Sequence, residues 1–423
     1  MLNKRNVFDV TVVADRFKNF GFVVILTVML IFLVLLASFN LSDHGDQQFS
    51  ELARSFLQGK LYFTQLPADA GLHDVAFFNG KYFWPLGPLP AFLLMPLVAI
   101  FDQFNLFFYQ GYIEFFITLS IFYLIFRISR IFKYATTDSL YLALAFGAGS
   151  SYLHIALIPK SYFYAQSLTV LLLLLAIHEF LTKKRYWLIG LYLGSVLMTR
   201  ITAVSGAIFF ILMSLTSNKK FTDKIRELLE IVAPLTASFI ILLIYNYSRF
   251  HNWWESGYNL QLVMKQFIVA RSYGLFSLAH LPGNLYYFLL GHPLPIFRDE
   301  VSHVLKPPYI VADPWGMSIF ITSPYYLYLF WGSYRDRLAK ILWITVIATA
   351  VPIFMYYGIG WIQFGYRYAL DFLPFLFLLF LIAIKQQTDK LSLKLKMRSP
   401  LADGQVAAGW KLYILPVGFN IPR

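Results

Sequence analysis

Apolar segments of roughly 20 residues, the length that an α-helix needs to cross a bilayer, recur along this chain. A soluble fold cannot bury so much apolar surface in one chain of 423 residues. The composition agrees, because 58% of the residues are hydrophobic and 13% are charged, against roughly 25% charged residues in soluble domains. We therefore predict an all-α polytopic membrane protein.

About ten segments are predicted to span the membrane. They are 20–39, 107–126, 139–157, 162–181, 186–198, 201–216, 229–248, 316–332, 341–360 and 368–384. The first follows basic residues and is too long for a cleaved signal peptide, so we expect an uncleaved anchor with its amino end inside. The apolar stretch 88–101 is short and contains three prolines, which favours an interfacial or re-entrant helix.

The placement of Lys and Arg sets the predicted orientation. If 88–101 does not span, the basic clusters fall on the side of the amino terminus, as the positive-inside tendency requires. This leaves two large outer loops, 40–106 and 249–315, within a membrane domain of residues 1–384, followed by a basic cytoplasmic tail, 385–423. Because the larger loops lie outside, we expect the protein to work on that face.

Several function classes are excluded or unsupported. With no cysteine, the chain has no disulfide, thiolate metal site or iron–sulfur cluster. No phosphate-binding glycine loop is present, and the histidines do not have a metal-ligand spacing. The net charge of +13 is explained by topology rather than by a nucleic-acid partner. We predict no cofactor and no metal.

The first outer loop carries the candidate acids. Asp43 and Asp46 follow the first apolar segment directly, and residues 47–57 have the spacing of an amphipathic surface helix that Gly59 would end. A carboxylate at this depth can face a lipid head group. Asp74 lies later in the same loop. Taken alone, each Asp fits a helix cap or turn at least as well.

Cations and aromatic residues at the outer membrane edge are the next candidates. Arg200 stands at the tip of a predicted helical hairpin, which is costly unless it faces a polar cavity or pairs with an acid such as Glu114. Arg367 lies four residues before Asp371 and would pair with it on a helix. Tyr258, in the second outer loop, belongs either to a sugar-stacking surface or to the interfacial aromatic belt, which we favour.

The order of motifs over residues 20–384 resembles the GT-C superfamily of integral-membrane glycosyltransferases, such as the protein mannosyltransferases and bacterial aminoarabinose transferases. The matching elements are DQQFSELARSFLQG at 46–59, GKYF at 80–83, the Pro-rich 85–90, MTR at 198–200, YNYSRFHNWWESGY at 245–258 and QFGYRYALDFLPFL at 363–376. The aminoarabinose-transferase pattern has a Lys before its paired prolines, whereas Trp84 stands here and the nearest Lys is Lys81.

The resemblance implies sugar transfer from a polyprenyl-phosphate donor to a glycan, lipid or protein acceptor, on the extracytoplasmic side of a bacterial inner membrane. Such a donor has a stabilised leaving group, so the enzyme needs a carboxylate for the acceptor proton and cations for the phosphate. Asp46 is the implied general base, with Asp43 as the alternate. The implied substrate-binding residues are Asp74, Lys81, Tyr82, Arg200, Tyr258 and Arg367. A secondary transporter or lipid flippase stays open as the alternative, although acids gathered in one outer loop do not favour it.

Overall fold

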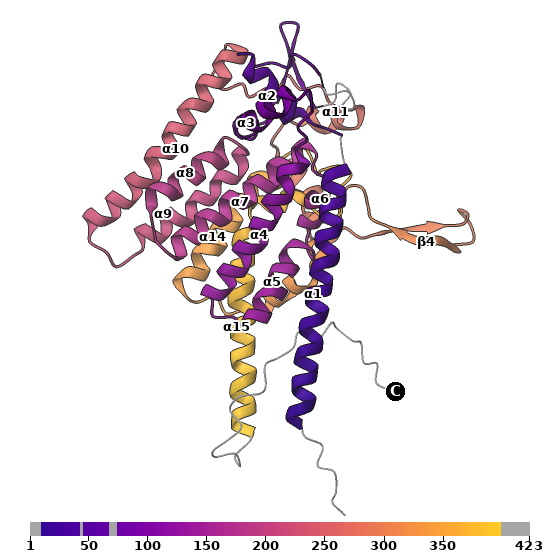
Figure 1. Ribbon diagram of the computed structural model, residues 1–423, viewed down its shortest axis with the longest axis vertical. Coiled ribbons are helices and arrows are strands. Elements are labelled where there is room, and N and C mark those ends of the chain that lie inside the picture. Colours follow the sequence, from indigo (N-terminus) through magenta and orange to yellow (C-terminus); the bar gives the residue numbers. More distant parts are fainter. Residues whose placement is uncertain (1–9, 43–44, 67–73, 399–423) are drawn as a thin grey trace, which may run out of the picture.

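The computed structural model describes residues 10–42, 45–66 and 74–398, which form a helical bundle with a cap of shorter elements at one end (Figure 1). The bundle helices are α1 Val10–Ser42, α4 Gly111–Ile131, α5 Thr136–Gly147, α6 Tyr152–Leu157, α7 Ser161–Leu181, α8 Tyr186–Leu197, α9 Ala207–Leu215, α10 Phe221–Phe250, α14 Arg337–Met355 and α15 Leu373–Arg398. The remaining α-helices are α2 Gln48–Leu57, α3 Leu89–Gln103, α11 Lys265–Ser272, α12 Leu281–Leu289 and α13 Ile319–Thr322.

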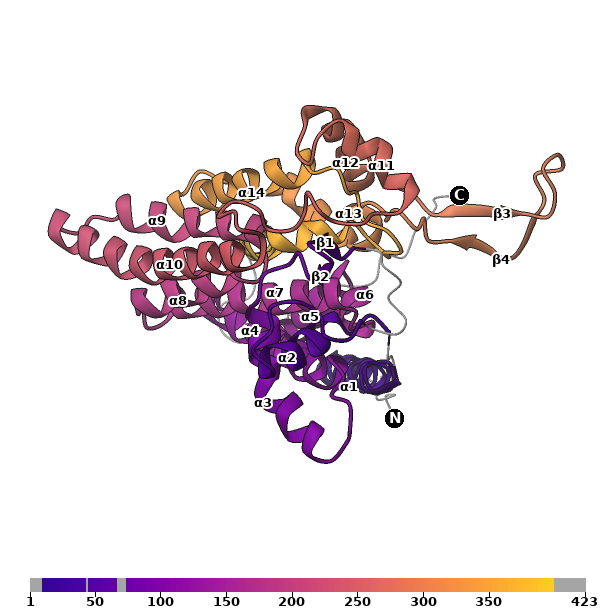
Figure 2. The same ribbon diagram turned by 90° about the horizontal axis from the view of Figure 1, so that it is seen from above.

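Four 3-10 helices and two antiparallel hairpins complete the described part of the chain. The 3-10 helices are η1 Ile201–Gly206, η2 Leu278–His280, η3 Pro324–Trp331 and η4 Arg367–Asp371, and the strands are β1 Ala76–Phe78, β2 Lys81–Phe83, β3 Leu294–Phe297 and β4 Leu305–Val311. Seen from above, α2 and α3 lie on one side of the cap and α11 and α12 on the other, with the β1–β2 hairpin between them (Figure 2).

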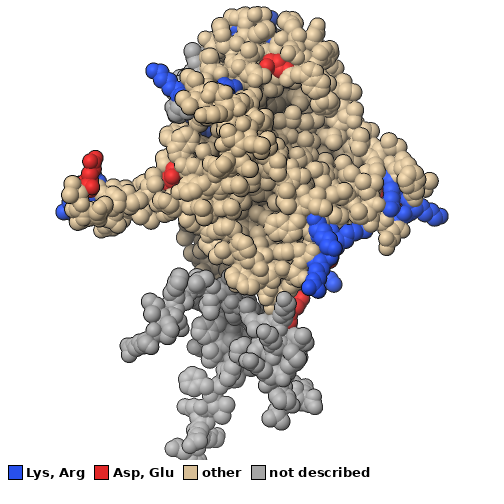
Figure 3. Space-filling view, turned by 180° about the vertical axis from the view of Figure 1, so that it is seen from behind, with Lys and Arg blue, Asp and Glu red and all other residues tan. Residues whose placement is uncertain are grey.

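Five of the described helices are long and apolar enough to cross a membrane, so the chain is an integral membrane protein. They are residues 21–42 of α1, together with α4, α7, α10 and α14. The span in α7 is 72% buried and that in α1 is 17% buried, so α7 is central and α1 is peripheral. On the face shown in Figure 3, charged side chains are sparse over the middle of the bundle. The ten predicted spans are not confirmed as a set.

Two of the predicted spans are wrong as continuous helices. Residues 139–157 divide between α5 and α6, because glycine and serine occupy the junction at 147–151 and favour turns over helix. Residues 316–332 hold one turn of α13 and then η3. Ser318 begins α13 by accepting a hydrogen bond from the amide of Phe320, and Pro324 prevents the helix from continuing.

The predicted hairpin of 186–198 and 201–216 corresponds to α8 and the η1–α9 segment, with Arg200 at the break between them. The α8 helix packs closely on α10. A Cβ added at Gly190 would lie 2.4 Å from the carbonyl oxygen of Ile231, and one at Gly194 would lie 2.2 Å from Ser238 Oγ. These glycines therefore allow the two backbones to approach.

The cap confirms the short elements predicted in the first outer loop. The amphipathic helix is α2, which ends before Gly59 at a φ of 69°. The turn of the β1–β2 hairpin has Asn79 and Gly80 at positive φ, as a two-residue hairpin loop requires. The predicted interfacial helix is α3, and it packs against α2. Arg54 and Asp102 join these two helices by an ion pair of 2.5 Å.

The ends of the described chain extend away from the cap. The first half of α1 and the last half of α15 both project from the opposite end of the bundle (Figure 1). The start of the predicted tail, 385–398, continues α15, while 399–423 lies outside the described residues. The start of the described part of α1 and the end of α15 therefore lie at the same end of the bundle.

Candidate functional site

A polar cavity of about 370 Å³ lies at the cap end of the bundle, where the first outer loop meets α7 and the segment before η4. It contains two of the predicted acids, Asp46 and Asp74, and the predicted cation Arg367. The other lining residues used below are His154, Lys160, Tyr162, Gln261, Tyr356 and Tyr368. The structure thus brings two candidates from the first predicted outer loop together with Arg367, which lies more than 250 residues further along the chain.

Asp46 has a fixed backbone and an open carboxylate. Its φ is 51°, a left-handed conformation that Asp adopts more readily than most residues. Its carbonyl oxygen accepts hydrogen bonds from the Ser161 amide at 3.1 Å, from Ser161 Oγ at 2.6 Å and from Gln110 Nε2 at 3.1 Å. The carboxylate is 33% exposed and lies 3.2 Å from Lys160 Nζ. The backbone is thus held rigidly while the carboxylate faces the cavity.

Gln110 holds the chain around Asp46 in place. It is fully buried, and its side-chain oxygen accepts from the amide of Phe49 at 3.1 Å. Its own amide donates to Gln47 Oε1 at 2.8 Å. Gln110 therefore ties the start of α2 to the start of α4. A long-range clamp of this kind leaves no local pattern in the sequence.

Asp74 enters the same cavity from the far end of the first loop. Its φ is 68°, and its amide donates to the Leu262 carbonyl at 2.7 Å. Gln261 Nε2 donates to the Asp74 carbonyl at 3.1 Å and to the Tyr162 hydroxyl at 2.9 Å. The two predicted outer loops and α7 therefore meet at Asp74.

Arg367 is the cation of the polar cavity that has no acidic partner among the described residues. Its Nη1 donates to Gln166 Oε1 at 3.0 Å, and its guanidinium lies over the rings of Phe163 and Tyr368 at 5.1 and 4.6 Å. Its Nε is buried and has no hydrogen-bond partner in the described part of the chain. A buried guanidinium with an unused donor is suited to bind an anion.

His154 forms another part of the cavity wall. One ring nitrogen lies 3.0 Å from the carbonyl oxygen of Ile362. Burial lowers the pKa of His154 to about 4, and the charges of Arg367 and Lys160 act in the same direction. The ring is therefore neutral at physiological pH and does not compete with Arg367 or Lys160 for an anion.

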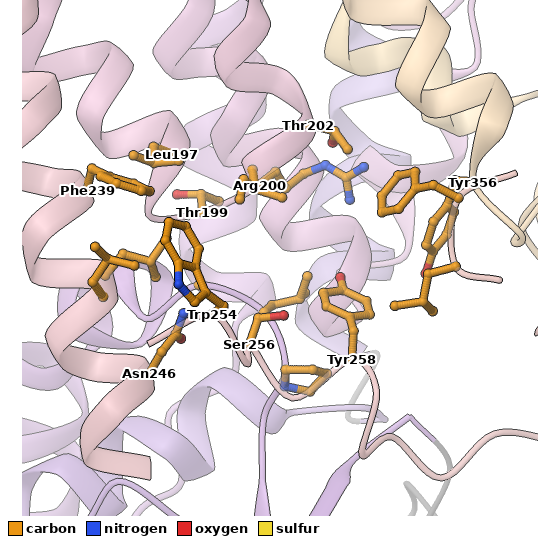
Figure 4. Close-up of a pocket in the computed structure, with 18 of the residues that line it drawn as sticks. Leu197, Thr199, Arg200, Thr202, Phe239, Asn246, Trp254, Ser256, Tyr258 and Tyr356 are labelled. Carbon is orange, nitrogen blue, oxygen red and sulfur yellow. The ribbon is translucent and has the colours of Figure 1, made fainter. Parts of the chain in front are cut away.

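An apolar cavity of about 290 Å³ adjoins the polar one and is shown in Figure 4. Three tyrosines line both cavities and form their common wall: Tyr162, Tyr356 and Tyr368. Leu197, Phe239 and Trp254 extend the apolar cavity between α8 and α10, and Figure 4 shows the Tyr258 hydroxyl pointing toward Arg200. Burial raises the pKa of Tyr258, so its hydroxyl keeps its proton.

Arg200 lines this cavity but is paired with an acid. Its Nε and Nη2 donate to the two oxygens of Asp371 at 2.8 and 3.1 Å, and Thr202 donates to the same carboxylate at 2.5 Å. The predicted pairing with Glu114 is wrong, because Glu114 lies in α4 and bonds to Thr118. The predicted Arg367–Asp371 pair is also wrong, because these residues lie in the 3-10 helix η4 and Arg200 occupies the carboxylate.

Arg249 is the second buried cation of the apolar cavity. Its guanidinium donates to the carbonyl oxygens of Trp84 and Ser256 at 2.7 and 3.2 Å and to Asn246 Oδ1 at 2.9 Å. These bonds tie the end of α10 to both outer loops. Arg249 therefore has a clear structural role, in addition to any contact with a ligand.

The other predicted site residues lie elsewhere. Lys81 and Tyr82 are in β2 and line neither cavity, and the Lys81 ammonium lies 4.4 Å from the ring centre of Tyr62. Tyr258 lines the apolar cavity, and its carbonyl accepts a hydrogen bond from Arg271. Asp43 lies outside the described residues.

Sequence reasoning missed Lys160, Gln110 and the tyrosines of the common wall. For Lys160 a signal was present: it is a basic residue directly before the apolar run of α7, at the outer edge where the other cations were sought. For the tyrosines there was no signal, since Tyr and Trp at membrane edges usually form an interfacial belt.

Comparisons with known proteins yield one structural likeness. No family model and no curated protein matches the sequence. The structure is similar to the crystal structure of the Archaeoglobus fulgidus oligosaccharyltransferase in the apo form, with a TM-score of 0.48 and 11% sequence identity. The match covers 89% of this chain and 52% of that one, so the chain spans about half the length of that protein.

Proposed function

We propose that this protein is a membrane glycosyltransferase of the GT-C type, which moves a sugar from a polyprenyl-phosphate donor to an extracytoplasmic acceptor. Asp46 is the general base, and Arg367 and Lys160 hold the donor phosphate. The acceptor is a glycan, lipid or protein. The resemblance favours a bacterial inner membrane, and the charge distribution favours an orientation with the cap on its outer side.

The observation that carries the proposal is the pair of adjoining cavities. A lipid-linked sugar has a long apolar chain, a charged phosphate and a polar sugar. The apolar cavity suits the chain, and the polar cavity suits the sugar and the acceptor. The phosphate would lie at the tyrosine wall, where Arg367 stacks on Tyr368. A lipid-linked sugar with its chain in the apolar cavity, its phosphate at the tyrosine wall and its sugar in the polar cavity would therefore occupy both cavities.

The residues support a single displacement. The acceptor hydroxyl oxygen attacks the anomeric carbon and forms the new glycosidic bond, while the bond from that carbon to the phosphate oxygen breaks. Asp46 takes the acceptor proton, and the lipid phosphate leaves with the electron pair of the broken bond. Arg367, which has no carboxylate partner among the described residues, stabilises the negative charge that develops on the phosphate. Asp74 positions the acceptor.

The proposal is tested with the purified full-length chain in liposomes, supplied with labelled polyprenyl-phosphate sugars and a cell-envelope extract. We expect label to move to an acceptor, and Asp46→Asn to reduce the rate by about 100-fold or more. Asp223→Asn is the matched control, because Asp223 is an exposed acid in the first turn of α10 and lines neither cavity. Full activity in both Asp46→Asn and Asp43→Asn would remove the proposed base.

The alternative of a transporter or flippase is separated by the same preparation. A transporter would take up solute, or move a labelled lipid between leaflets, without forming a glycosylated product. In that case Asp46→Asn would alter uptake, and neither the wild type nor the variant would show transferase activity. If the protein transfers label to an acceptor and takes up no solute, the transporter alternative is excluded.

A further inference from the structure

A two-stranded arm projects from the side of the bundle. Strands β3 and β4 pair as an antiparallel hairpin and extend well beyond the helices in both views (Figures 1 and 2). The turn is closed locally, because Asp299 accepts hydrogen bonds from the amides of Val301 and Ser302. Every residue of β4 is exposed. The arm is therefore a formed element that the rest of the described chain does not cover.

The arm is rich in exposed apolar side chains. The large ones are Leu294 and Phe297 of β3, Val304 after the turn, and Leu305, Tyr309, Ile310 and Val311 of β4, and the two strands contain one charged residue, Lys306. Val301, in the turn, is 87% exposed. A hairpin in water would be expected to carry more polar residues than this. The exposed apolar side chains instead fit an element that meets apolar surroundings.

The position of the arm identifies those surroundings. In Figure 1 it leaves the bundle below α2, α3 and α11, at the height of the upper part of α1, and Figure 2 shows it on the side of α11 and α12. The described span of α1 includes Gly21–Ser42, and its exposed apolar side chains face lipid. The upper end of α1 is tied to α6 by Asn40, which donates to the Ala156 carbonyl at 2.7 Å. The arm thus projects sideways at the height of a helix that is long and apolar enough to cross the membrane.

We propose that the arm lies in the lipid–water interface of the bilayer, with its apolar side chains at the boundary between head groups and acyl chains. An isolated two-stranded hairpin is marginally stable in water, so it needs such a partner. The unpaired strand edges require hydrogen bonds that the hydrocarbon core lacks, which keeps the arm at the interface. The charges of the arm, on Arg298, Asp299, Glu300 and Lys306, remain among the head groups.

The test uses the absence of cysteine from the chain, which allows single nitroxide labels at Val301→Cys and Ile310→Cys in the full-length protein. Two further labelled variants are references: Leu30→Cys, on the lipid-facing surface of α1, and Lys60→Cys, in the exposed loop after α2. In phosphatidylcholine vesicles, relaxation by oxygen reports lipid contact and relaxation by a water-soluble nickel chelate reports contact with water. We expect an oxygen-to-nickel ratio at both arm positions severalfold above that at Lys60→Cys and nearer to that at Leu30→Cys.

Two results would overturn the proposal. Ratios at Val301→Cys and Ile310→Cys equal to that at Lys60→Cys would mean that the arm stands in water. Strong dipolar broadening between labels that disappears on dilution with unlabelled protein would mean that a second copy of the chain covers the arm. Neither result bears on sugar transfer, so this inference and the proposed function are tested separately.

Discussion

The polar and the apolar cavities share a wall of tyrosines, but Arg200 in the apolar cavity and Arg367 in the polar cavity are held differently. In the apolar cavity, Arg200 is bound through two of its nitrogens by Asp371. In the polar cavity, Arg367 has an amide oxygen and two aromatic rings around it and a buried Nε without a partner among the described residues. The first arrangement stabilises a fold, and the second leaves binding capacity for an anion.

The largest expected effect is on stability, from breaking the paired site. Asp371→Asn leaves the Arg200 charge buried without compensation, and such changes cost about 3–5 kcal/mol. We expect a large loss of thermal stability in detergent, followed by the fluorescence of a dye bound to exposed apolar surface. The double variant Arg200→Met with Asp371→Leu removes both charges and is expected to recover most of the loss. Asp371→Asn with unchanged stability would contradict the structural role of the pair.

The second prediction concerns the unpaired site. Arg367→Gln removes a charged donor worth about 1.5–3 kcal/mol to a bound anion, which corresponds to roughly a 10- to 100-fold loss in kcat/KM for the lipid-linked donor. Thermal stability should fall far less than in Asp371→Asn. Arg367→Lys keeps the charge and should restore part of the activity. If Arg367→Gln unfolds the protein while leaving the remaining folded fraction fully active, the contrast between the two arginines is wrong.

A smaller effect is expected at Gln110, which holds Asp46 without touching the cavity contents. Gln110→Ala frees the Asp46 carbonyl and the Phe49 amide from one partner each. Unpaired buried groups cost about 1–3 kcal/mol, and the shifted carboxylate should lower kcat more than it raises KM for the donor. Gln110→Glu keeps the shape and an acceptor and should lie between wild type and Gln110→Ala. An effect confined to KM would assign Gln110 to binding instead.

Local features were predictable from sequence, and the pairings were not. The amphipathic α2 with its Gly59 end and the Asn79–Gly80 turn depend on neighbouring residues, so their patterns are readable. The partner of Arg200 lies 171 residues away, and no periodicity encodes such a contact. The Arg367–Asp371 pairing failed for a local reason, since it assumed α-helical spacing where the chain forms a 3-10 turn.

Span prediction failed where apolar composition was taken as helix. Segment 139–157 is largely apolar, but its central Gly and Ser residues separate α5 from α6. That break matters to the site, because α6 carries His154 into the wall of the polar cavity. Hydropathy measures how much apolar surface a segment offers, whereas backbone breaks decide where its polar residues are placed.

The smallest expected effect is the contribution of His154 to the pH dependence of stability. It tests whether the polar cavity disfavours an additional positive charge. The folded pKa of His154, about 4, lies below the unfolded value near 6.5, so the unfolded chain binds the extra proton between these limits. Stability should therefore fall as pH drops from about 6.5 to 4 and level off below that range. In His154→Gln this component is absent, so the thermal transition should shift less between pH 7 and pH 5 than in wild type. An equal shift in both proteins would show that His154 is not held neutral beside Arg367 and Lys160, and that the polar cavity accepts a further cation after all.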